Sequence, residues 1–311
     1  MKSSSNDDLF VVEPAVRAAL DAGRAVVALE SALITHGFPA PTNLEVARAA
    51  EEAVRSSGAV PATVAILEGR LTVGVDSGAL ETLARREDPA KASRRDLAAL
   101  LGRGRWAGTT VSATVFGAHR AGIAVFATGG IGGVHRGGER SLDVSADLDE
   151  LARTPLLVVC AGPKAILDLD LTLEALETRG VPVVGYGTDD LPGFLARESG
   201  RPVPTRVDTP GEAAELLHRQ RALGLDGAVL LCVPPPAETA LPRGELDAAI
   251  EAALAGAERL GLRGGATTPW LLGRLAELTG GRSVSANAAL IERNAAVAGA
   301  VAVAFAGLAV A

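Results

Sequence analysis

Several short aliphatic runs of the sequence are followed by residues that could do chemistry. Glu30, a glycine-rich stretch over residues 129–138, and Lys164 each come at or just after the end of such a run. In open parallel sheets, ligands bind beyond the carboxyl ends of the strands. These three places are therefore the first candidates for a functional site.

Glu30 directly ends the apolar run Ala25–Leu29. Burial disfavours the ionised form of a carboxyl group, so this position would raise its pKa and suit a general acid. A carboxylate that caps a helix or pairs with an arginine would occupy the same position. Sequence position alone favours neither interpretation.

Lys164 follows the apolar run Leu156–Cys160 and a Gly-Pro pair. We expect Pro163 in the first turn of a helix through Ala165–Leu169, which places the ammonium group at a helix N-terminus. That placement lowers the pKa of an amine, as a nucleophilic Schiff-base lysine requires. The alternative, an exposed lysine in water, is slightly favoured by spacing alone.

The glycine-rich stretch 129–138 does not fit the common nucleotide motifs. His135 stands where the dinucleotide fingerprint has its third glycine, and the Gly-Lys-Ser/Thr ending of a P-loop is missing. A loop whose backbone N–H groups approach a small anion, a flexible lid and a long turn remain open. His36 lies in a second candidate loop, whereas His119 and His218 lie in helical patterns and are expected to be structural.

Acidic residues cluster just after the glycine-rich stretch. Carboxylates of this kind suit a hard divalent ion such as Mg²⁺ or Mn²⁺. Ser145 or Asp147 could instead cap the following helix, with Asp149 and Glu150 in its first turn. Asp143, ahead of that helix, is therefore the best ligand candidate. No Cys/His spacing indicates a zinc site.

Two further segments could contact an anion. Lys91–Asp96 holds three cations and a possible N-cap, Ser93, so it could bind a phosphate, although a solvated basic turn is the common alternative. Gly108–Ser112 places hydroxyl groups, including that of Thr110, ahead of a helical pattern.

The elements that must position these residues follow one pattern, in which short aliphatic runs alternate with helical segments. Continuous apolar runs are typical of strands buried on both faces, and the alternation predicts a mostly parallel sheet. The runs are Ala25–Leu29, Thr63–Leu67, Ile123–Ala127, Leu156–Cys160, Val181–Gly185 and Ala228–Cys232, and the helical segments include Leu44–Arg55, Asp96–Leu101 and Ala213–Leu223. Leu71–Val75 is expected to form an antiparallel hairpin with the second run.

The last third of the chain is helical only, near 245–260, 269–278 and 285–305. Thr268 is expected to be the N-cap of the second of these helices, with Pro269 at its first position. The predicted fold is a three-layer α/β/α domain over residues 1–311, with residues 245–311 as a helical layer and residues 1–8 disordered.

Composition narrows the possible functions. The chain has 311 residues, 48% hydrophobic and 22% charged, with a net charge of -7 and 3% aromatics. These values exclude a disordered protein and argue against binding a nucleic acid polymer. Cys160 and Cys232 lie in apolar runs and no secretory signal is present, which indicates the cytoplasm. The uncharged tail Asn294–Ala311 is rich in Ala and Gly, so we expect it to pack on protein, not to cross a membrane.

The motifs described above also resemble those of the pseudouridine-5′-phosphate glycosidase (indigoidine synthase A-like) family, from about Val16 to about Ala300. The matching strings, in family order, are ALESALITHGFP, GAVPATVAILEGRLTVG, KASRRDL, GTTVSAT, VFATGGIGGVHRG, LDVSADLDEL, VVCAGPKAILDL and ANAALIERNA.

The resemblance implies reversible cleavage of pseudouridine 5′-phosphate to uracil and ribose 5-phosphate, with Mn²⁺ or another divalent cation such as Mg²⁺, in a homotrimer. It assigns the Schiff base to Lys164, proton donation to Glu30 and metal binding to Asp143. It places Asn287 against the base and His135 near the sugar or phosphate. The other substrate-lining positions are Lys91, Thr110, Val111, Ser145, Ala146 and Asp147.

The sequence departs from the family pattern in a few places. Pro163 replaces an alanine, and Val233 replaces an expected amide, which puts any contact from that loop in doubt. Gly187 and Leu195 stand where the family is bulkier. Two other functions remain: a Schiff-base lyase on a different phosphosugar adduct, and a non-catalytic nucleotide-binding homologue. The presence of Asn287 argues against the first, and the presence of Glu30, Lys164 and Asp143 argues against the second.

Overall fold

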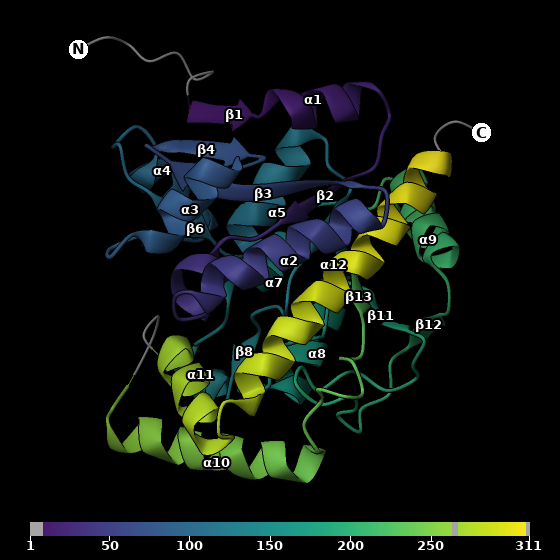
Figure 1. The fold of residues 1–311 in the computed structure, drawn as a ribbon. Coiled ribbons are helices and arrows are strands. Elements are labelled where there is room, and N and C mark those ends of the chain that lie inside the picture. The colour runs from purple at the N-terminus through teal and green to yellow at the C-terminus, as the bar shows by residue number, and fades with distance from the viewer. Residues whose placement is uncertain (1–8, 263–266, 309–311) are drawn as a thin grey trace.

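A computed structural model describes residues 9–262 and 267–308 of the chain. The expected disorder of residues 1–8 lies outside the described residues. A mixed, mostly parallel sheet of eleven strands forms the centre of the molecule (Figure 1). Its main path runs through β1 (Phe10–Val12), β4 (Arg70–Val73), β3 (Val60–Leu67), β2 (Val26–Leu29), β7 (Val125–Ala127), β9 (Leu157–Cys160), β13 (Val229–Cys232), β11 (Val183–Tyr186) and β12 (Thr205–Val207).

The aliphatic runs form the parallel strands of this sheet, as predicted. β2, β7, β9, β13 and β11 pair in parallel, and every residue of β2, β9 and β13 is buried. β4 is antiparallel to β3, which confirms the predicted hairpin. Two short strands, β5 (Ala90–Ala92) and β6 (Ala107–Thr109), extend the sheet from β3 and bring Lys91 and Thr110 toward its carboxyl edge.

Helices cover both faces of the sheet, and the alternation of side chains along each strand supplies an apolar surface to both. Val27 and Val159 pack on one face and Ala28 and Val158 on the other. The first face is covered by α2 (Thr42–Ser56), α9 (Pro210–Ala222) and α12 (Arg282–Leu308), and the second by α1 (Pro14–Asp21), α5 (Val111–Ala121), α7 (Ala146–Leu151) and α8 (Leu169–Thr178). The predicted three-layer α/β/α fold is therefore confirmed.

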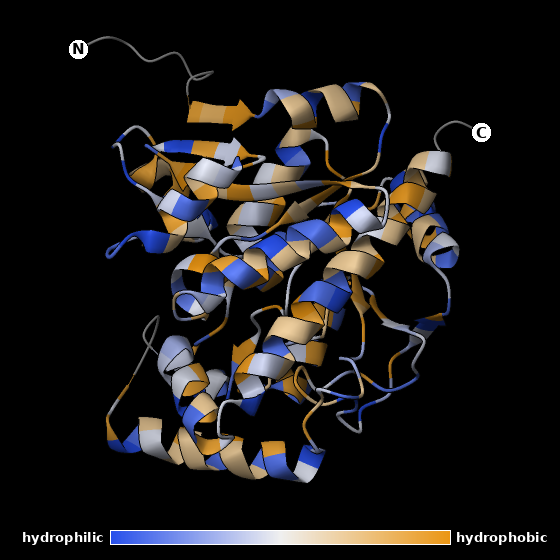
Figure 2. Ribbon diagram, viewed as in Figure 1, coloured by the Kyte–Doolittle hydropathy of each residue, from blue (hydrophilic) through white to orange (hydrophobic). Residues whose placement is uncertain are grey.

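The C-terminal helix α12 is the one helix in the described part of the chain that is long and apolar enough to cross a membrane by length and composition. In the structure it lies across α2 and beside α9 (Figure 1), with Leu290, Ala295 and Ala298 in the core. Tan and orange residues predominate along α12 in Figure 2, whereas α2 carries more hydrophilic ones. The predicted packing of this helix on protein is confirmed for its described residues.

Two further helices, α10 (Arg243–Arg259) and α11 (Thr267–Leu278), lie at one end of the molecule (Figure 1). Their residues Ala253, Ala257 and Leu271 form a small core with Ile166 and Leu167, just after Lys164. Because α11 begins at Thr267, the prediction that Thr268 is its N-cap is wrong. The first N–H groups of a helix have no intrahelical partner, so Pro269 is tolerated as the third described residue of α11 and not as its first.

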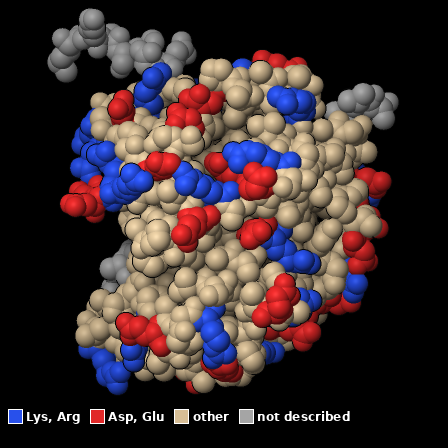
Figure 3. All heavy atoms as spheres, viewed as in Figure 1, with Lys and Arg blue, Asp and Glu red and all other residues tan. Residues whose placement is uncertain are grey.

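Short elements connect the larger ones. They are α3 (Ser77–Arg85), α4 (Leu97–Leu100), α6 (Gly138–Ser141), a π-turn over Leu33–Gly37, a 3₁₀ turn over Arg94–Asp96, and a two-stranded sheet of β8 (Val134–His135) and β10 (Leu167–Asp168). On the face in Figure 3, positive and negative side chains are interspersed. This face does not present the continuous basic surface that a nucleic acid polymer requires.

Candidate active site

A cavity of about 400 Å³ gathers every site residue that the sequence analysis assigned. These residues are Glu30, Lys91, Thr110, Val111, His135, Asp143, Ser145, Ala146, Asp147, Lys164 and Asn287. Glu30 and Lys164 come from the segments that follow β2 and β9, so the cavity lies at the carboxyl edge of the parallel strands. The structure therefore brings the predicted residues together in one cavity, whereas its function as the site and the role of each residue stay predictions.

Glu30 is buried at the end of β2, with 9% of its surface exposed. Burial raises the pKa of its carboxyl group, while the positive charge of Lys164 and a hydrogen bond from Thr128 oppose this rise. The hydrogen bond comes from the Thr128 hydroxyl to Oε1 of Glu30. Neither a helix cap nor an arginine pair, the alternatives left open by the sequence, is the contact that the structure gives this carboxyl.

Lys164 lies in a turn that follows β9, and its Nζ donates a hydrogen bond to the carbonyl oxygen of Gly130 at 2.6 Å. The predicted helix over Ala165–Leu169 is wrong. Leu167 and Asp168 instead form β10, which pairs with β8 in the glycine-rich stretch, and α8 begins only at Leu169. Because Lys164 does not lie at a helix N-terminus, the predicted effect of a helix dipole on its amine does not apply.

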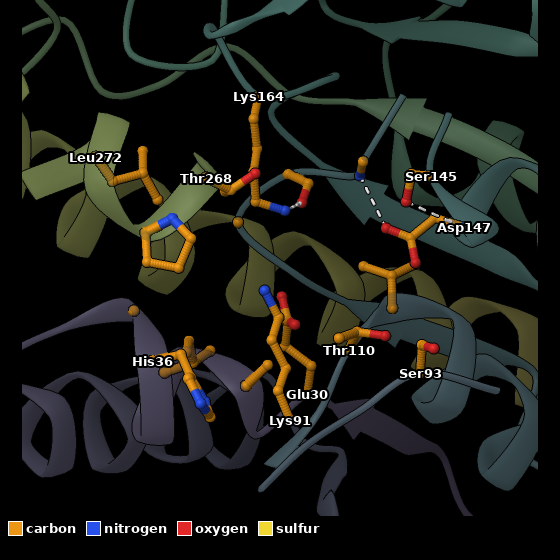
Figure 4. A pocket seen from close by; sticks show the side chains of 18 of the residues that line it. Glu30, His36, Lys91, Ser93, Thr110, Ser145, Asp147, Lys164, Thr268 and Leu272 are labelled. Carbon is orange, nitrogen blue, oxygen red and sulfur yellow. Dashed lines mark hydrogen bonds between the residues drawn. The ribbon is translucent and has the colours of Figure 1, made fainter. Parts of the chain in front are cut away.

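Lys91 extends from β5 into the same cavity, beside Glu30 (Figure 4). Desolvation lowers the pKa of its ammonium group, the nearby positive charge of Lys164 lowers it further, and Glu30 partly offsets both effects. Lys164 approaches from the opposite side in the same view. A buried carboxyl group thus lies close enough to two amines for their charges to act on one another, although Lys91 itself is exposed at the rim of the cavity.

The glycine-rich stretch forms a closely packed wall of the cavity. A Cβ atom on Gly132 would lie 2.2 Å from Oγ of Ser145, and one on Gly130 would lie 2.8 Å from the ring of Phe194. The backbone N–H of Gly132 also donates to Oδ2 of Asp147 at 2.9 Å. Of the three interpretations left open, these contacts argue against a flexible lid, and an anion-binding loop and a long turn both stay open.

Asp147 joins two walls of the cavity through backbone contacts. Its carboxylate accepts one hydrogen bond from the N–H of Ser112 and one from the N–H of Gly132, both at 2.9 Å. Ser145 caps α7, since its hydroxyl accepts from the N–H of Asp147 at 3.2 Å. Glu150, on the same helix, is fully buried against Arg94 and so anchors the segment that follows Lys91.

Asp143, the predicted metal ligand, lines the cavity, and its backbone oxygen accepts from the N–H of His135 at 3.0 Å. Among the described residues, no three or more His, Cys, Asp or Glu side chains form a group that could hold a metal ion. Mg²⁺ and related ions commonly keep several waters and use one or two carboxylates together with substrate oxygens. The donor set therefore fits a largely hydrated cation and not one enclosed by protein ligands.

The cavity has a polar end and a less polar end. In Figure 4 the hydroxyls of Ser93, Thr110 and Ser145 lie on one side of the amines, and His36 and Leu272 lie on the other. Other apolar residues that line the cavity are Leu33, Phe38, Phe194 and Ile291. This gradient suits an elongated molecule with an anionic group at one end and a flat, less charged group at the other.

Some lining and supporting residues were not assigned from the sequence. His36 lines the cavity, and burial together with nearby Lys91 lowers the pKa of its imidazole. Its place after a strand made it a candidate, but no spacing rule gave it a role. Thr128 was missed entirely, although it directly follows the run that ends at Ala127. Leu272 was missed because an apolar residue on a helix carries no sign of facing a cavity.

A buried acid close to two amines at the carboxyl edge of a parallel sheet is the arrangement expected of an enzyme that acts on a small molecule. The family model described as "Indigoidine synthase A like protein" matches residues 15–304, and the chain belongs to this family.

Relatives in several bacteria carry one name. The protein named "Pseudouridine-5'-phosphate glycosidase" in Methylobacterium nodulans is 55% identical to this chain, and the match covers 94% of this chain and 87% of the relative. The relative of that name in Paracoccus denitrificans is 53% identical, with 96% and 99% covered.

Solved structures agree with the fold. The prealnumycin C-glycosynthase AlnA, solved in complex with ribulose 5-phosphate, is 42% identical with a TM-score of 0.90 and coverage of 98% and 99%. An indigoidine synthase A-like protein of Thermotoga maritima is 34% identical with a TM-score of 0.88 and the same coverage.

Proposed function

We propose that this enzyme reversibly cleaves the C–C glycosidic bond of pseudouridine 5′-phosphate to give uracil and ribose 5-phosphate. The observation that carries the proposal is the buried carboxyl of Glu30 facing Lys164 and Lys91 in one cavity. The names of the relatives support the reaction, and the ribulose 5-phosphate complex of AlnA supports a phosphosugar as ligand.

In this mechanism Lys164 acts as the nucleophile. Its Nζ forms a bond to C1′ of the sugar as the C1′–O4′ bond breaks, and O4′ takes a proton from Glu30. The Glu30 carboxylate takes a proton from the attached Nζ, which restores the nitrogen lone pair. This lone pair forms a C1′=N double bond while the electron pair of the C1′–C5 bond moves to C5 of uracil, and C5 takes the proton from Glu30. Water hydrolyses the resulting imine, which releases ribose 5-phosphate and restores the amine.

The two ends of the cavity hold the two parts of the substrate. The hydroxyls of Ser93, Thr110 and Ser145, with the ammonium of Lys91, bind the phosphate end. Asn287 donates to and accepts from the uracil edge, because an amide offers both groups. Val111, Ala146 and His135 complete the sugar site.

Asp143 would hold Mn²⁺ or Mg²⁺, which when bound supplies a template and a Lewis acid for substrate oxygens. The chain acts as a cytoplasmic homotrimer in this proposal. Two observations are in keeping with a reducing compartment: Cys160 and Cys232 are both free, and both are buried. Light scattering of the purified protein measures the assembly directly.

The test is incubation of the protein with pseudouridine 5′-phosphate and Mn²⁺, with uracil followed by chromatography. We expect uracil release that a chelator suppresses. Borohydride with ribose 5-phosphate should trap an adduct on the wild type and none on Lys164→Ala, with Lys2→Ala as the control for loss of a lysine. A reduced adduct in Lys164→Ala would overturn the role of that lysine.

A second candidate, cleavage of a different phosphosugar adduct, is favoured by the similarity to AlnA, named as a C-glycosynthase. It predicts borohydride trapping of the sugar phosphate without uracil release. Screening other C-linked adducts of ribose 5-phosphate would then identify the leaving group. A homologue without catalysis predicts neither trapping nor release.

A further inference from the structure

The carboxyl group of Glu30 has a specific hydrogen-bond partner that the mechanism above does not use. The hydroxyl of Thr128 donates to Oε1 of Glu30, and both side chains are buried. Within the described part of the chain, Thr128 is the hydrogen-bond donor to the Glu30 carboxyl, and it contacts Oε1 and not Oε2. Hydrogen bonds to a carboxylate are among the stronger ones in proteins and fix its rotation as well as its charge.

Thr128 is itself held from two directions. Its N–H donates to the carbonyl oxygen of Val159 in β9 at 3.0 Å. Its carbonyl oxygen accepts from Nδ2 of Asn294 in α12 at 2.8 Å, and the same nitrogen lies 3.4 Å from the carbonyl oxygen of Gly129. The hydroxyl therefore projects from a backbone position fixed by both the sheet and the covering helix.

Asn294 is an unusual residue for its place in α12. It is 1% exposed, and its neighbours on the core side include Leu290, Ile291 and Ala298. A buried amide costs free energy unless it is hydrogen-bonded, so an apolar residue would suit packing alone better. The amide of Asn294 provides the contact to the segment that carries Thr128. Asn294 lies seven residues after Asn287, which lines the cavity from the same helix.

We propose that Thr128 is a positioning residue for Glu30, holding Oε1 so that Oε2 meets the substrate, and that Asn294 in turn fixes Thr128. The inference rests on the proton transfer assigned to Glu30 in the proposed function. It adds to the proposed mechanism a hydrogen-bond donor to Glu30, the Thr128 hydroxyl, which is not among the residues that line the cavity.

Charged groups from three other elements also act on Glu30. They are Lys164 after β9, Asp147 in α7 and Lys91 in β5. Lys164 and Lys91 favour the carboxylate and Asp147 disfavours it. Loss of the Thr128 hydroxyl leaves all three charges in place but also changes the burial of Glu30, the largest cause of its raised pKa, so a variant that restores a hydroxyl is needed for comparison.

The experiment compares Thr128→Val, which keeps the shape and removes the hydroxyl, with Thr128→Ser, which restores it. Thr63→Val is the matched control: the buried Thr63 lines a small cavity together with Glu30 and Thr128, but its hydroxyl donates to Oε1 of Glu51 at 2.7 Å and not to Glu30. Each full-length protein is labelled with ¹³Cδ-glutamate, and the Glu30 signal, assigned with Glu30→Gln, is titrated by NMR. The pH profile of kcat/KM is measured alongside.

We expect the titration midpoint of Glu30 in Thr128→Val to move to higher pH by about one unit, because a donor to the carboxylate is lost. The kcat/KM limb that belongs to Glu30 should move in the same direction, and kcat should fall about ten-fold or more with little change in KM. Thr128→Ser and Thr63→Val should keep the wild-type midpoint. Asn294→Leu should move it upward by less.

A Thr128→Val midpoint equal to that of Thr63→Val overturns the positioning role, even if activity falls. Should Thr128→Val not fold, Asn294→Leu takes its place in the comparison, and an unchanged midpoint in that variant would overturn the proposal. If the midpoint rises in Thr128→Val but the wild-type protein releases no uracil, the hydrogen bond is supported and the proposed function is rejected.

Discussion

Burial of Glu30 raises the free energy of its ionised form in the folded protein. Its folded-state pKa is raised, so the folded protein binds this proton more tightly than the unfolded chain does. The free energy of unfolding that Glu30 contributes is therefore fully present below the unfolded pKa and lost as the pH rises through the folded pKa. At neutral pH a neutral residue of the same shape should suit the site better.

We expect Glu30→Gln to raise the melting temperature at pH 8 and to reduce kcat roughly 10²- to 10⁴-fold, because a general acid is lost. The gain in stability should shrink as the pH falls toward 4.5, the ordinary pKa of glutamate. Calorimetry across this pH range checks the sign. The exposed Glu52→Gln is the control, and equal melting temperatures for both variants would show that burial of Glu30 carries no such cost.

At the level of elements, the short helix α7 connects the walls of the cavity. The two backbone N–H groups bound by Asp147 belong to α5 and to the glycine-rich stretch, which are distant in sequence. Asp149, two residues further on, pairs with Arg179 at the surface, with 65% of its side chain exposed. One turn of helix thus offers a buried and an exposed carboxylate for comparison.

Asp147→Ala should lower the free energy of unfolding by about 3 kcal/mol, because it leaves one buried and one partly buried N–H group without their acceptor. It should also raise KM, since both walls lose their fixed spacing. Asp149→Ala should cost less than about 1 kcal/mol, as exposed ion pairs do. Denaturant titration and steady-state kinetics measure both effects. Similar losses in the two variants would contradict the role of α7.

The elements also show which patterns predict structure reliably. Apolar runs such as Leu156–Cys160 form strands because side chains alternate between the two faces of a strand, and both faces of this sheet are covered by helices. β3 begins at Val60, ahead of the predicted Thr63. The earlier start was missed because Pro61 argues against a strand, although residues 60–62 also pair with β2. The helix expected after Pro163 did not form, since Leu167 and Asp168 pair with Val134 and His135, a long-range contact that local propensity cannot reveal.

The candidate site followed the same division. Residues that directly follow a strand, such as Glu30 and Lys164, could be placed in the cavity from the sequence because the sheet edge collects them. Asn294 and Leu272 could not, because their positions depend on how α12 and α11 lie against the sheet. The strings that matched a known family added assignments that spacing alone left open.

At the scale of the whole molecule, α12 links the cavity to the opposite end of the sheet. Asn287 lies at the cavity, and Gly299 lies against Ser57 at the end of α2. A Cβ atom on Gly299 would lie 2.6 Å from Cβ of Ser57, which is closer than two side chains can approach. The hydroxyl of Ser57 also donates to the carbonyl oxygen of Ala296 at 3.0 Å.

Gly299→Ala should therefore destabilise the protein by about 1–3 kcal/mol through overpacking, although alanine favours a helix. It should also lower kcat/KM, because a displaced α12 moves Asn287. Gly307→Ala on the same helix meets nothing within 4 Å and should be neutral or stabilising by less than about 1 kcal/mol. Thermal unfolding and uracil release test both. A stabilised Gly299→Ala would show that α12 tolerates displacement.

Part of the less polar wall of the cavity comes from the two C-terminal helices, whereas the proposed reacting groups come from earlier in the chain. Glu30, Lys91 and Lys164 precede residue 165, whereas Leu272, Asn287 and Ile291 belong to α11 and α12. Under the proposed function, mutation of α11 and α12 can therefore reshape part of the surface that meets the leaving group without changing Glu30, Lys91 or Lys164. This arrangement favours the evolution of new specificities under the proposed function, because substitutions in α11 and α12 can change which aglycone is accepted while Glu30, Lys91 and Lys164 are retained.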